Sequence, residues 1–214
     1  MRVVLLLACL MAGCLAEKPH PCASPALLSG LITVSTQNEK LWTFAKYLYD
    51  ALGHKVRLME LGTYENKSFT YDALLLFREN VMYEIHEHNR TCKKKPLKAD
   101  FQPLVIPKDA TLVGQFVLGS SSGPGEGLLI NTWTGDLPDK TGKYVSSVTE
   151  FGCIPVTTLF QTEQFGWVVT SYVNNIKGIT DPSQLNPPDF CHDEESKDNN
   201  EEPANFLSLF LPKI

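Results

Sequence analysis

The feature that most constrains the fold is the spacing of apolar residues, which repeats every two positions over most of residues 28–180. Between residues 69 and 77 the odd positions are apolar or aromatic, and after a short polar turn the alternation resumes in residues 81–85. Successive side chains of a β-strand point to opposite faces, so this pattern predicts a hairpin with one apolar face. No stretch shows the 3.6-residue spacing of a long amphipathic helix.

Further segments have the same strand character, and turn residues (Gly, Pro, Asn and Asp) separate them. They are residues 44–50, 55–61, 111–119, 127–133, 143–151, 156–161 and 165–173. A chain of 214 residues suits one large domain of this kind. We therefore predict a single all-β, mainly antiparallel domain over residues 17–214. One short C-terminal helix is expected at residues 206–211, capped by Asn205.

The N-terminus has the organisation of a secretory signal peptide over residues 1–16. Arg2 is followed by an apolar run at residues 3–12, and residues 14–16 fit the small-x-small pattern that precedes a cleavage position after Ala16. The run is shorter than the roughly 20 residues of a membrane-spanning helix, so we expect a secreted chain that does not span a membrane. An alternative is a bacterial lipobox with Cys14 as its lipid anchor.

The remaining cysteines and two sequons support the secretory interpretation. Removal of the signal peptide leaves Cys22, Cys92, Cys153 and Cys191, which predict two disulfides with three alternative pairings. No C-x-x-C pair is present, which disfavours a zinc ribbon or a redox centre. The triplets that begin at Asn66 and Asn89 predict N-glycans and therefore exposure of both residues.

The distribution of charged residues excludes one class of partner and leaves calcium binding open. The net charge of −5 excludes a basic nucleic-acid surface. Seven carboxylates lie in the acidic segment at residues 189–202, against a single lysine. This segment, which runs to about residue 203, is either a flexible, solvated linker or a calcium ligand set without EF-hand spacing. His86 and His88 share one strand face and could bind zinc, but the opposite face carries the core residues, so we expect them to face solvent.

Motifs for catalysis are absent. The sequence contains no G-x-S-x-G elbow, P-loop, H-E-x-x-H or kinase motif, so we predict that the protein is not an enzyme. The glycine-rich residues 119–127 lead into a strand rather than a helix, so a hairpin loop is favoured over a phosphate site. In residues 127–133 and 165–173, apolar side chains occupy both faces, so a core must cover one face and a partner, a helix or a ligand the other. The alternative is a two-layer core that covers both faces.

Several short motifs, in order and spacing together, resemble the ependymin family. The resemblance extends from Pro21 to about Leu211, and the motifs lie at residues 21–30, 81–85, 89–95, 106–111, 152–156 and 187–191. It implies a curved antiparallel half-barrel with a deep apolar pocket, similar to bacterial lipoprotein carriers. It also implies secreted glycoproteins of vertebrate brain fluid and other tissues that dimerise and bind calcium, some of them lysosomal. Finally, it implies disulfides between Cys22 and Cys153 and between Cys92 and Cys191.

Together these features predict a noncatalytic binder of lipid-like molecules, with calcium as the candidate ion. The residues expected to line the pocket are Phe116, Leu118, Leu129, Trp133, Trp167 and Val169. The alternatives are a calcium-dependent matrix or cell-adhesion glycoprotein of brain fluid and, as a third option, a hydrolase.

A noncovalent homodimer is also expected, through residues 127–151 with Trp133 and Tyr144; the alternative is a monomer whose apolar surplus lies wholly in the pocket. Some ependymins have a further cysteine where this chain has Phe151, which argues against a disulfide-linked dimer.

Overall fold

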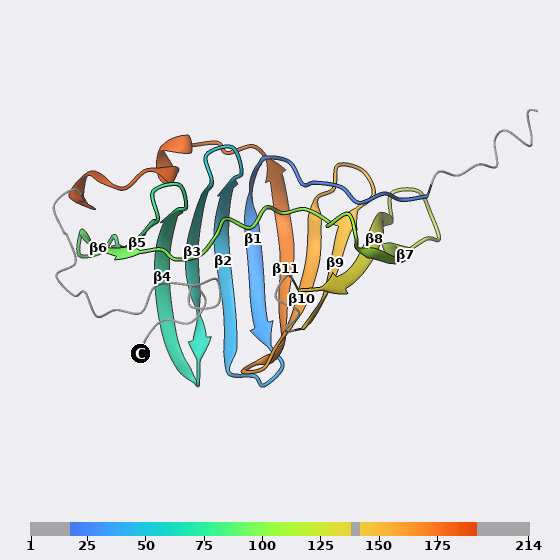
Figure 1. Ribbon diagram of the computed structural model, residues 1–214, viewed down its shortest axis with the longest axis horizontal. Coiled ribbons are helices and arrows are strands. Elements are labelled where there is room, and N and C mark those ends of the chain that lie inside the picture. The colour runs from blue at the N-terminus through green and yellow to red at the C-terminus, as the bar shows by residue number, and fades with distance from the viewer. Residues whose placement is uncertain (1–17, 138–141, 192–214) are drawn as a thin grey trace, which may run out of the picture.

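The computed structural model describes residues 18–137 and 142–191, which form one open antiparallel sheet of eleven strands (Figure 1). The strands are β1 (Leu27–Thr36), β2 (Leu41–Asp50), β3 (Lys55–Tyr64), β4 (Lys67–Leu76), β5 (Val81–His86), β6 (Thr91–Pro96), β7 (Thr111–Gly119), β8 (Gly127–Asp136), β9 (Lys143–Thr149), β10 (Pro155–Thr162) and β11 (Gly166–Lys177). The predicted all-β, antiparallel class is confirmed. The likeness to a half-barrel lipoprotein carrier stays a prediction.

Two strands, β1 and β6, are not among those predicted. β1 has apolar residues in both phases around Gly30, because it lies in the middle of the sheet between β2 and β11. β6 lacks the apolar alternation that predicts a strand, because its sequence Thr-Cys-Lys-Lys-Lys-Pro contains almost no apolar side chain. It nevertheless pairs with β5 and forms one edge of the sheet.

The order of the strands determines how the two faces are covered. Strands β1 to β6 extend from the centre to one edge, and β7 to β11 return from the other edge to the centre, where β11 pairs with β1. The connection from β6 to β7, which we call the crossing segment (residues 97–110), therefore traverses the whole sheet, as the green trace in Figure 1 shows. It buries Leu97 and Ile106 on the way.

The main core lies on the face beneath the crossing segment, which we call the covered face. Cross-strand partners in a sheet point to the same side, so the register defines this face across strands. Its largest cluster comes from the five neighbouring strands β11, β1, β2, β3 and β4. Members of this cluster include Leu28, Ile32, Val34, Tyr47, Tyr49, Leu58, Leu75 and Val168.

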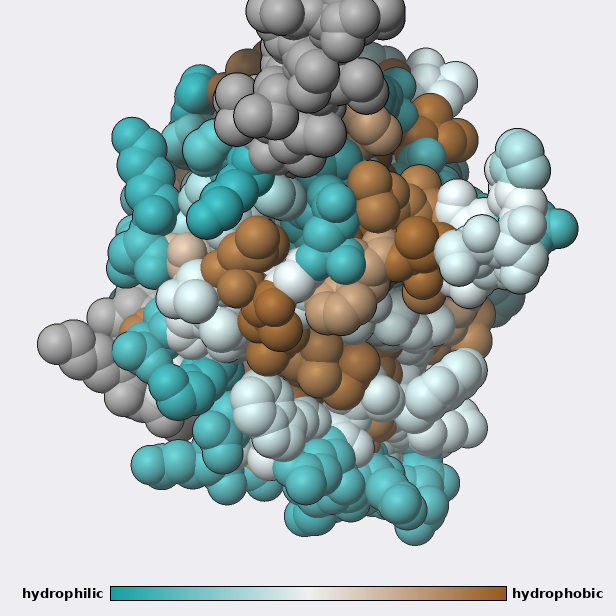
Figure 2. Space-filling model, turned by 90° about the vertical axis from the view of Figure 1, so that its right-hand side faces the viewer, coloured by the Kyte–Doolittle hydropathy of each residue, from teal (hydrophilic) through white to brown (hydrophobic). Residues whose placement is uncertain are grey.

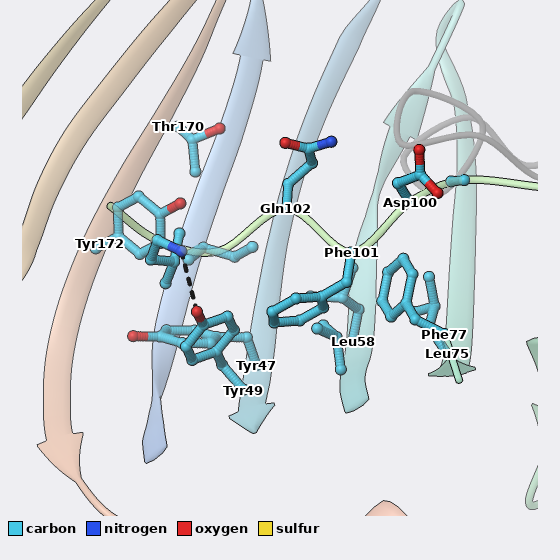
Figure 3. Close-up of a pocket in the computed structure, with 14 residues that line it drawn as sticks. Tyr47, Tyr49, Leu58, Leu75, Phe77, Asp100, Phe101, Gln102, Thr170 and Tyr172 are labelled. Atoms are coloured by element: carbon cyan, nitrogen blue, oxygen red, sulfur yellow. Dashed lines mark hydrogen bonds between the residues drawn. The ribbon is translucent and has the colours of Figure 1, made fainter. Parts of the chain in front are cut away.

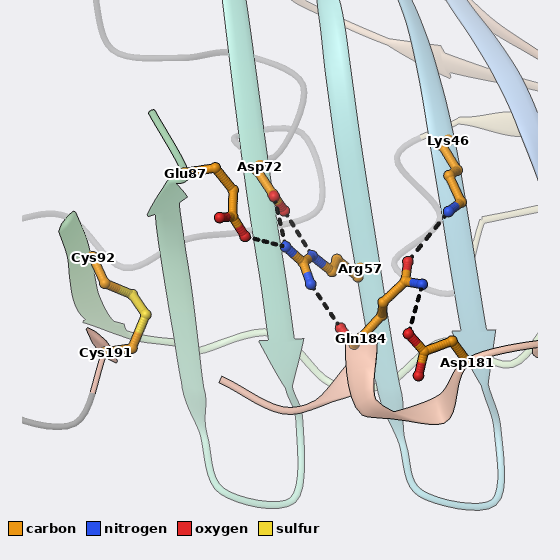
Figure 4. Close-up of polar contacts among 8 residues, drawn as sticks. All are labelled: Lys46, Arg57, Asp72, Glu87, Cys92, Asp181, Gln184 and Cys191. Carbon is orange, nitrogen blue, oxygen red and sulfur yellow. Dashed lines mark hydrogen bonds and ion pairs between the residues drawn. A yellow bond between two sulfur atoms is a disulfide. The ribbon is translucent and has the colours of Figure 1, made fainter. Parts of the chain in front are cut away.

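The opposite face, which we call the outer face, is covered towards β6 by described residues. There the 3-10 helix η1 (Pro182–Leu185) packs with β2 to β5. The buried Arg57 guanidinium donates two hydrogen bonds to Asp72, at 2.9 and 2.8 Å, and a third to the Gln184 carbonyl oxygen at 3.0 Å (Figure 4). This arrangement pairs a buried charge and attaches η1 to the sheet.

Two disulfides attach peripheral segments to the sheet. Cys22 bonds to Cys153 in the β9–β10 turn, and Cys92 in β6 bonds to Cys191 in the 3-10 helix η2 (Asp189–Cys191) (Figure 4). These are the pairs that the family resemblance implied. The predicted signal peptide, the C-terminal helix and most of the acidic segment lie outside the described residues. No helix in the described part is long and apolar enough to cross a membrane.

Candidate functional site

A pocket opens on the covered face, between the crossing segment and the sheet (Figure 3). Its cavity volume is about 110 Å³. Strands β1 to β4 and β11 supply one wall and the crossing segment supplies the other. The lining residues are Ile32, Tyr47, Tyr49, Val56, Leu58, Leu75, Phe77, Ala99, Asp100, Phe101, Gln102, Leu104, Thr170 and Tyr172. Nearly all of them present apolar or aromatic surface, which is typical of a site for an uncharged organic ligand.

Phe101 is the residue that fixes the crossing segment over the pocket. Its ring stacks on His54 with a centroid distance of 4.7 Å and on Tyr49 at 5.7 Å, and it meets the Phe77 ring edge-on at 5.3 Å. Figure 3 shows the ring pointing down towards the sheet while the residues on either side of it point away. No periodic pattern in residues 97–110 marks this ring in the sequence, because the segment is neither strand nor helix.

The tyrosine hydroxyls around the pocket are already hydrogen-bonded. The Tyr47 hydroxyl donates to Asn175 Oδ1 at 2.6 Å, and the Tyr49 hydroxyl accepts from the Leu104 backbone N–H at 3.0 Å. Burial raises the pKa of Tyr47 well above its usual range and that of Tyr172 to about 12. These phenols are therefore neutral, and they offer the pocket hydrogen-bonded rings rather than charge.

One carboxyl side chain lies buried on the same face. Glu60 on β3 is 4% exposed, and burial raises its pKa to about 8. The Thr43 hydroxyl donates to its Oε2 at 3.4 Å, whereas its Oε1 has no hydrogen-bond partner. Sequence reasoning missed this residue, although a signal existed: Glu60 occupies the phase of β3 in which Val56 and Leu58 are apolar.

The lining predicted from the sequence differs from that of this pocket. None of the six residues named for it borders the cavity, because the register divides them between both faces. Trp133 is on the covered face but belongs to a separate cluster with Ile106, Val148 and Cys153, and Leu129 shares its phase on β8. The other four lie on the outer face. Phe116 and Leu118 of β7 pair with Ile130 and Leu128 of β8, which point away from the face of Trp133. Trp167 and Val169 of β11 alternate with Val168 and Thr170, whose side chains are on the covered face.

Of the remaining predicted sites, Asn66, Asn89 and His88 are exposed, whereas His86, expected to face solvent, is half-buried in the same phase of β5 as the core residue Met82. Asn66 lies in the two-residue β3–β4 turn with a positive φ of 64°, and Asn89 lies in the β5–β6 turn; both are exposed. No cluster of His, Cys, Asp or Glu suited to a metal ion occurs within residues 18–137 and 142–191, where His86 contacts Glu84 at 3.2 Å. The structure therefore assigns no ligand to calcium, and residues 192–202 of the acidic segment are not described.

A second surface of interest is β7, which is the last strand of the described sheet at the edge opposite β6. Its sequence, Thr-Leu-Val-Gly-Gln-Phe-Val-Leu-Gly, has no charge. Its exposed apolar residues are Val113, Phe116, Val117 and Leu118, together with Leu128 of β8. Figure 2 shows apolar side chains gathered on this end of the molecule. The other edge, β6, carries three lysines and a proline, which hinder pairing with another chain. Trp133 and Tyr144, expected at an interface, are instead buried.

Comparison with known proteins identifies the relatives of this chain. The family model for Ependymin matches residues 65–191. Ependymin-1 of Oncorhynchus mykiss is 32% identical over 209 residues, covering 94% of this chain and 93% of the relative. Ependymin-2 of Carassius auratus is 30% identical, covering 95% and 97%. Mammalian ependymin-related protein 1 of Mus musculus is 29% identical, covering 85% and 80%.

A solved structure shows the same fold at much lower sequence similarity. The crystal structure of an uncharacterized conserved protein from Thermus thermophilus matches with a TM-score of 0.50 and 11% identity, covering 79% of this chain and 89% of that one. That likeness concerns the fold alone. The two disulfides are consistent with a secreted protein. With the family model matching more than half of its residues and relatives aligned over nearly its whole length, the chain belongs to the ependymin family.

Proposed function

We propose that this protein is a secreted, noncatalytic binder of hydrophobic molecules, which it holds between the crossing segment and the covered face. The observation that carries the proposal is the aromatic and aliphatic lining of the pocket, in which the tyrosine hydroxyls are already bonded. Burying apolar ligand surface there is favourable by about 25 cal/mol per Å².

The size of the cavity indicates what has to move. An apolar cavity of about 150 Å³ holds benzene, so a volume of about 110 Å³ admits only a small group or part of a chain. A lipid-sized ligand requires displacement of part of the crossing segment, so contacts between this segment and the rest of the molecule must break. They include the Phe101 ring stack, the bond from Leu104 to Tyr49 and a bond from the Leu97 N–H to the Asn80 carbonyl oxygen at 2.9 Å.

A matched pair of variants tests this proposal. Val56→Phe adds a ring inside the pocket, and Val173→Phe makes the same change at an exposed position on the outer face. We expect the neutral dye N-phenyl-1-naphthylamine to bind the wild-type protein and Val173→Phe alike, and Val56→Phe at least tenfold more weakly. Failure of the wild-type protein to bind the dye, or equal affinities of all three, would reject the proposal. Native mass spectrometry of protein from its own host, with no lipid recovered, would also count against it.

Calcium binding and matrix adhesion form the alternative function, and they rest on the acidic segment. Replacing Glu194, Glu195 and Glu201 with glutamine tests whether this segment carries the ion. If calcium titrations of the full chain and of this variant are the same, the segment is not the site. Calcium-dependent attachment of cells to immobilised protein distinguishes adhesion from ligand transport, and trafficking of tagged protein distinguishes secretion from delivery to the lysosome.

A noncovalent homodimer is proposed through the edge strand β7 rather than through Trp133 and Tyr144. An uncharged, apolar edge favours strand pairing between two copies, and the four described cysteines are all used within the chain. Sedimentation should show a dimer at micromolar concentration with or without reductant, and a monomer for Val117→Lys. As a control, Lys94→Val removes a charge from the other edge strand, β6, and should leave the dimer intact. A wild-type monomer, or a dimer lost only on reduction, would overturn this assignment.

A further inference from the structure

The starting observation is that Glu60 lies in the same cross-strand row as two residues of the pocket wall. Tyr172 pairs with Ile32, Ile32 with Ala45, and Ala45 with Glu60, so all four side chains project from the covered face side by side. Tyr172 and Ile32 line the cavity. Only the methyl group of Ala45 stands between Ile32 and Glu60, so the row contains no large side chain that separates the carboxyl group from the pocket.

Glu60 is also singled out by its unused hydrogen-bonding capacity. Within the described part of the chain, two buried side-chain atoms have no hydrogen-bond partner, Glu60 Oε1 and Trp133 Nε1. Trp133 belongs to the separate cluster beneath β8 and β9. A buried polar atom without a partner costs roughly 1–3 kcal/mol. That cost is recovered when a ligand supplies the missing partner.

The chemistry of the group selects the ligand. Because burial raises the pKa of Glu60 to about 8, the side chain is a neutral carboxylic acid at pH 7, which can donate one hydrogen bond and accept another. No ion pair of the described residues includes Glu60. Its hydrogen-bond partner is the Thr43 hydroxyl, and Tyr71 is its cross-strand neighbour on β4. A ligand carboxylate or ammonium would be buried here without a counter-charge, which is costly, whereas a hydroxyl group would match both functions of the acid.

We infer that Glu60 is the polar anchor of the pocket and that the ligand is an uncharged amphiphile whose terminal hydroxyl hydrogen-bonds to this carboxyl group. The inference rests on the proposed function, because it requires the apolar part of the ligand to occupy the pocket beneath Phe101. It adds the class of the polar group and the residue that recognises it.

The test compares two probes of equal length that differ in hydrogen bonding, 1-octanol and 1-chlorooctane, each displacing N-phenyl-1-naphthylamine. We expect the wild-type protein to bind 1-octanol about tenfold more tightly than 1-chlorooctane, the contribution of one net hydrogen bond. Glu60→Leu should abolish this preference while binding 1-chlorooctane within about threefold of wild type, because the apolar wall is unchanged. Glu60→Gln, which keeps a donor and an acceptor, should retain the preference. The exposed control Glu79→Gln should behave as wild type.

The outcomes separate the two proposals. Dye binding without any preference for the alcohol, or a preference that persists in Glu60→Leu, overturns the role of Glu60 and leaves the pocket function standing. Tighter binding of octylammonium or octanoate than of 1-octanol overturns the assignment of an uncharged ligand. If the dye does not bind at all, both the proposed pocket function and the proposed role of Glu60 are rejected. A loss of binding in Glu60→Leu for both probes indicates a structural role and also rejects the inference.

Discussion

Glu60 makes a prediction about stability that can be measured without any ligand. The ordinary pKa of a glutamate side chain is 4.5, and in the folded chain burial raises that of Glu60 to about 8 because it disfavours the ionised form. Between these two pH values the folded chain holds a proton that the unfolded chain has released. The free energy of unfolding contributed by this group is therefore fully present below pH 4.5 and decreases as the pH rises through about 8.

The magnitude follows from the same two values. Each pH unit between them is equivalent to about 1.4 kcal/mol, so the decrease amounts to at most about 5 kcal/mol across the whole interval. Glu60→Gln cannot ionise and should lack this component of the pH dependence. The two proteins should differ least near pH 4.5, and the variant should gain stability relative to wild type as the pH increases.

The assay is equilibrium unfolding in urea at several pH values from 5 to 8, with disulfides intact and tryptophan fluorescence as the signal. Taking the difference between wild type and Glu60→Gln cancels the titration of every other group. Glu79→Gln, at an exposed position, serves as the control and should run parallel to wild type. If the curve of Glu60→Gln also runs parallel to wild type, the carboxyl group of Glu60 is not buried in neutral form and the reasoning fails.

Other predictions concern the outer face, the disulfides and the glycans. Arg57→Met should lower the free energy of unfolding by up to about 3–5 kcal/mol because the half-buried Asp72 carboxylate then loses its partner, and adding Asp72→Leu should restore most of it in urea unfolding. Removing the Cys92–Cys191 bridge, whose partners are 99 residues apart, should cost up to about 4–5 kcal/mol by chain entropy and lower the melting temperature in calorimetry. An unchanged melting temperature would refute that estimate. Treatment with peptide N-glycosidase should reduce the mass of the native protein in two steps, one for each sequon, and a single step would leave one sequon unoccupied.

Much of the fold follows from local pattern. The two-residue alternation predicts the β4–β5 hairpin and most other strands, because a pleated strand exposes alternate residues to opposite sides whatever lies beyond it. The exposure of Asn66 and Asn89 follows from their places in tight turns. The absence of a 3.6-residue period correctly excludes long helices from the described residues. These features depend on neighbours in the sequence, so the sequence by itself determines them.

The pocket depends on contacts between residues far apart in the sequence. Alternation divides a strand into two faces but does not say which face will be covered, and this is why the predicted lining placed Phe116 and Trp133 together although they point to opposite sides. Only the pairing of β1 with β11 places β6 and β7 at opposite edges, and only that arrangement sends residues 97–110 across the sheet with Phe101 facing inwards. The burial of Glu60 has the same origin. A charged residue in an apolar phase is visible in the sequence, but its desolvation, and with it its chemistry, is decided by what the tertiary structure packs over it.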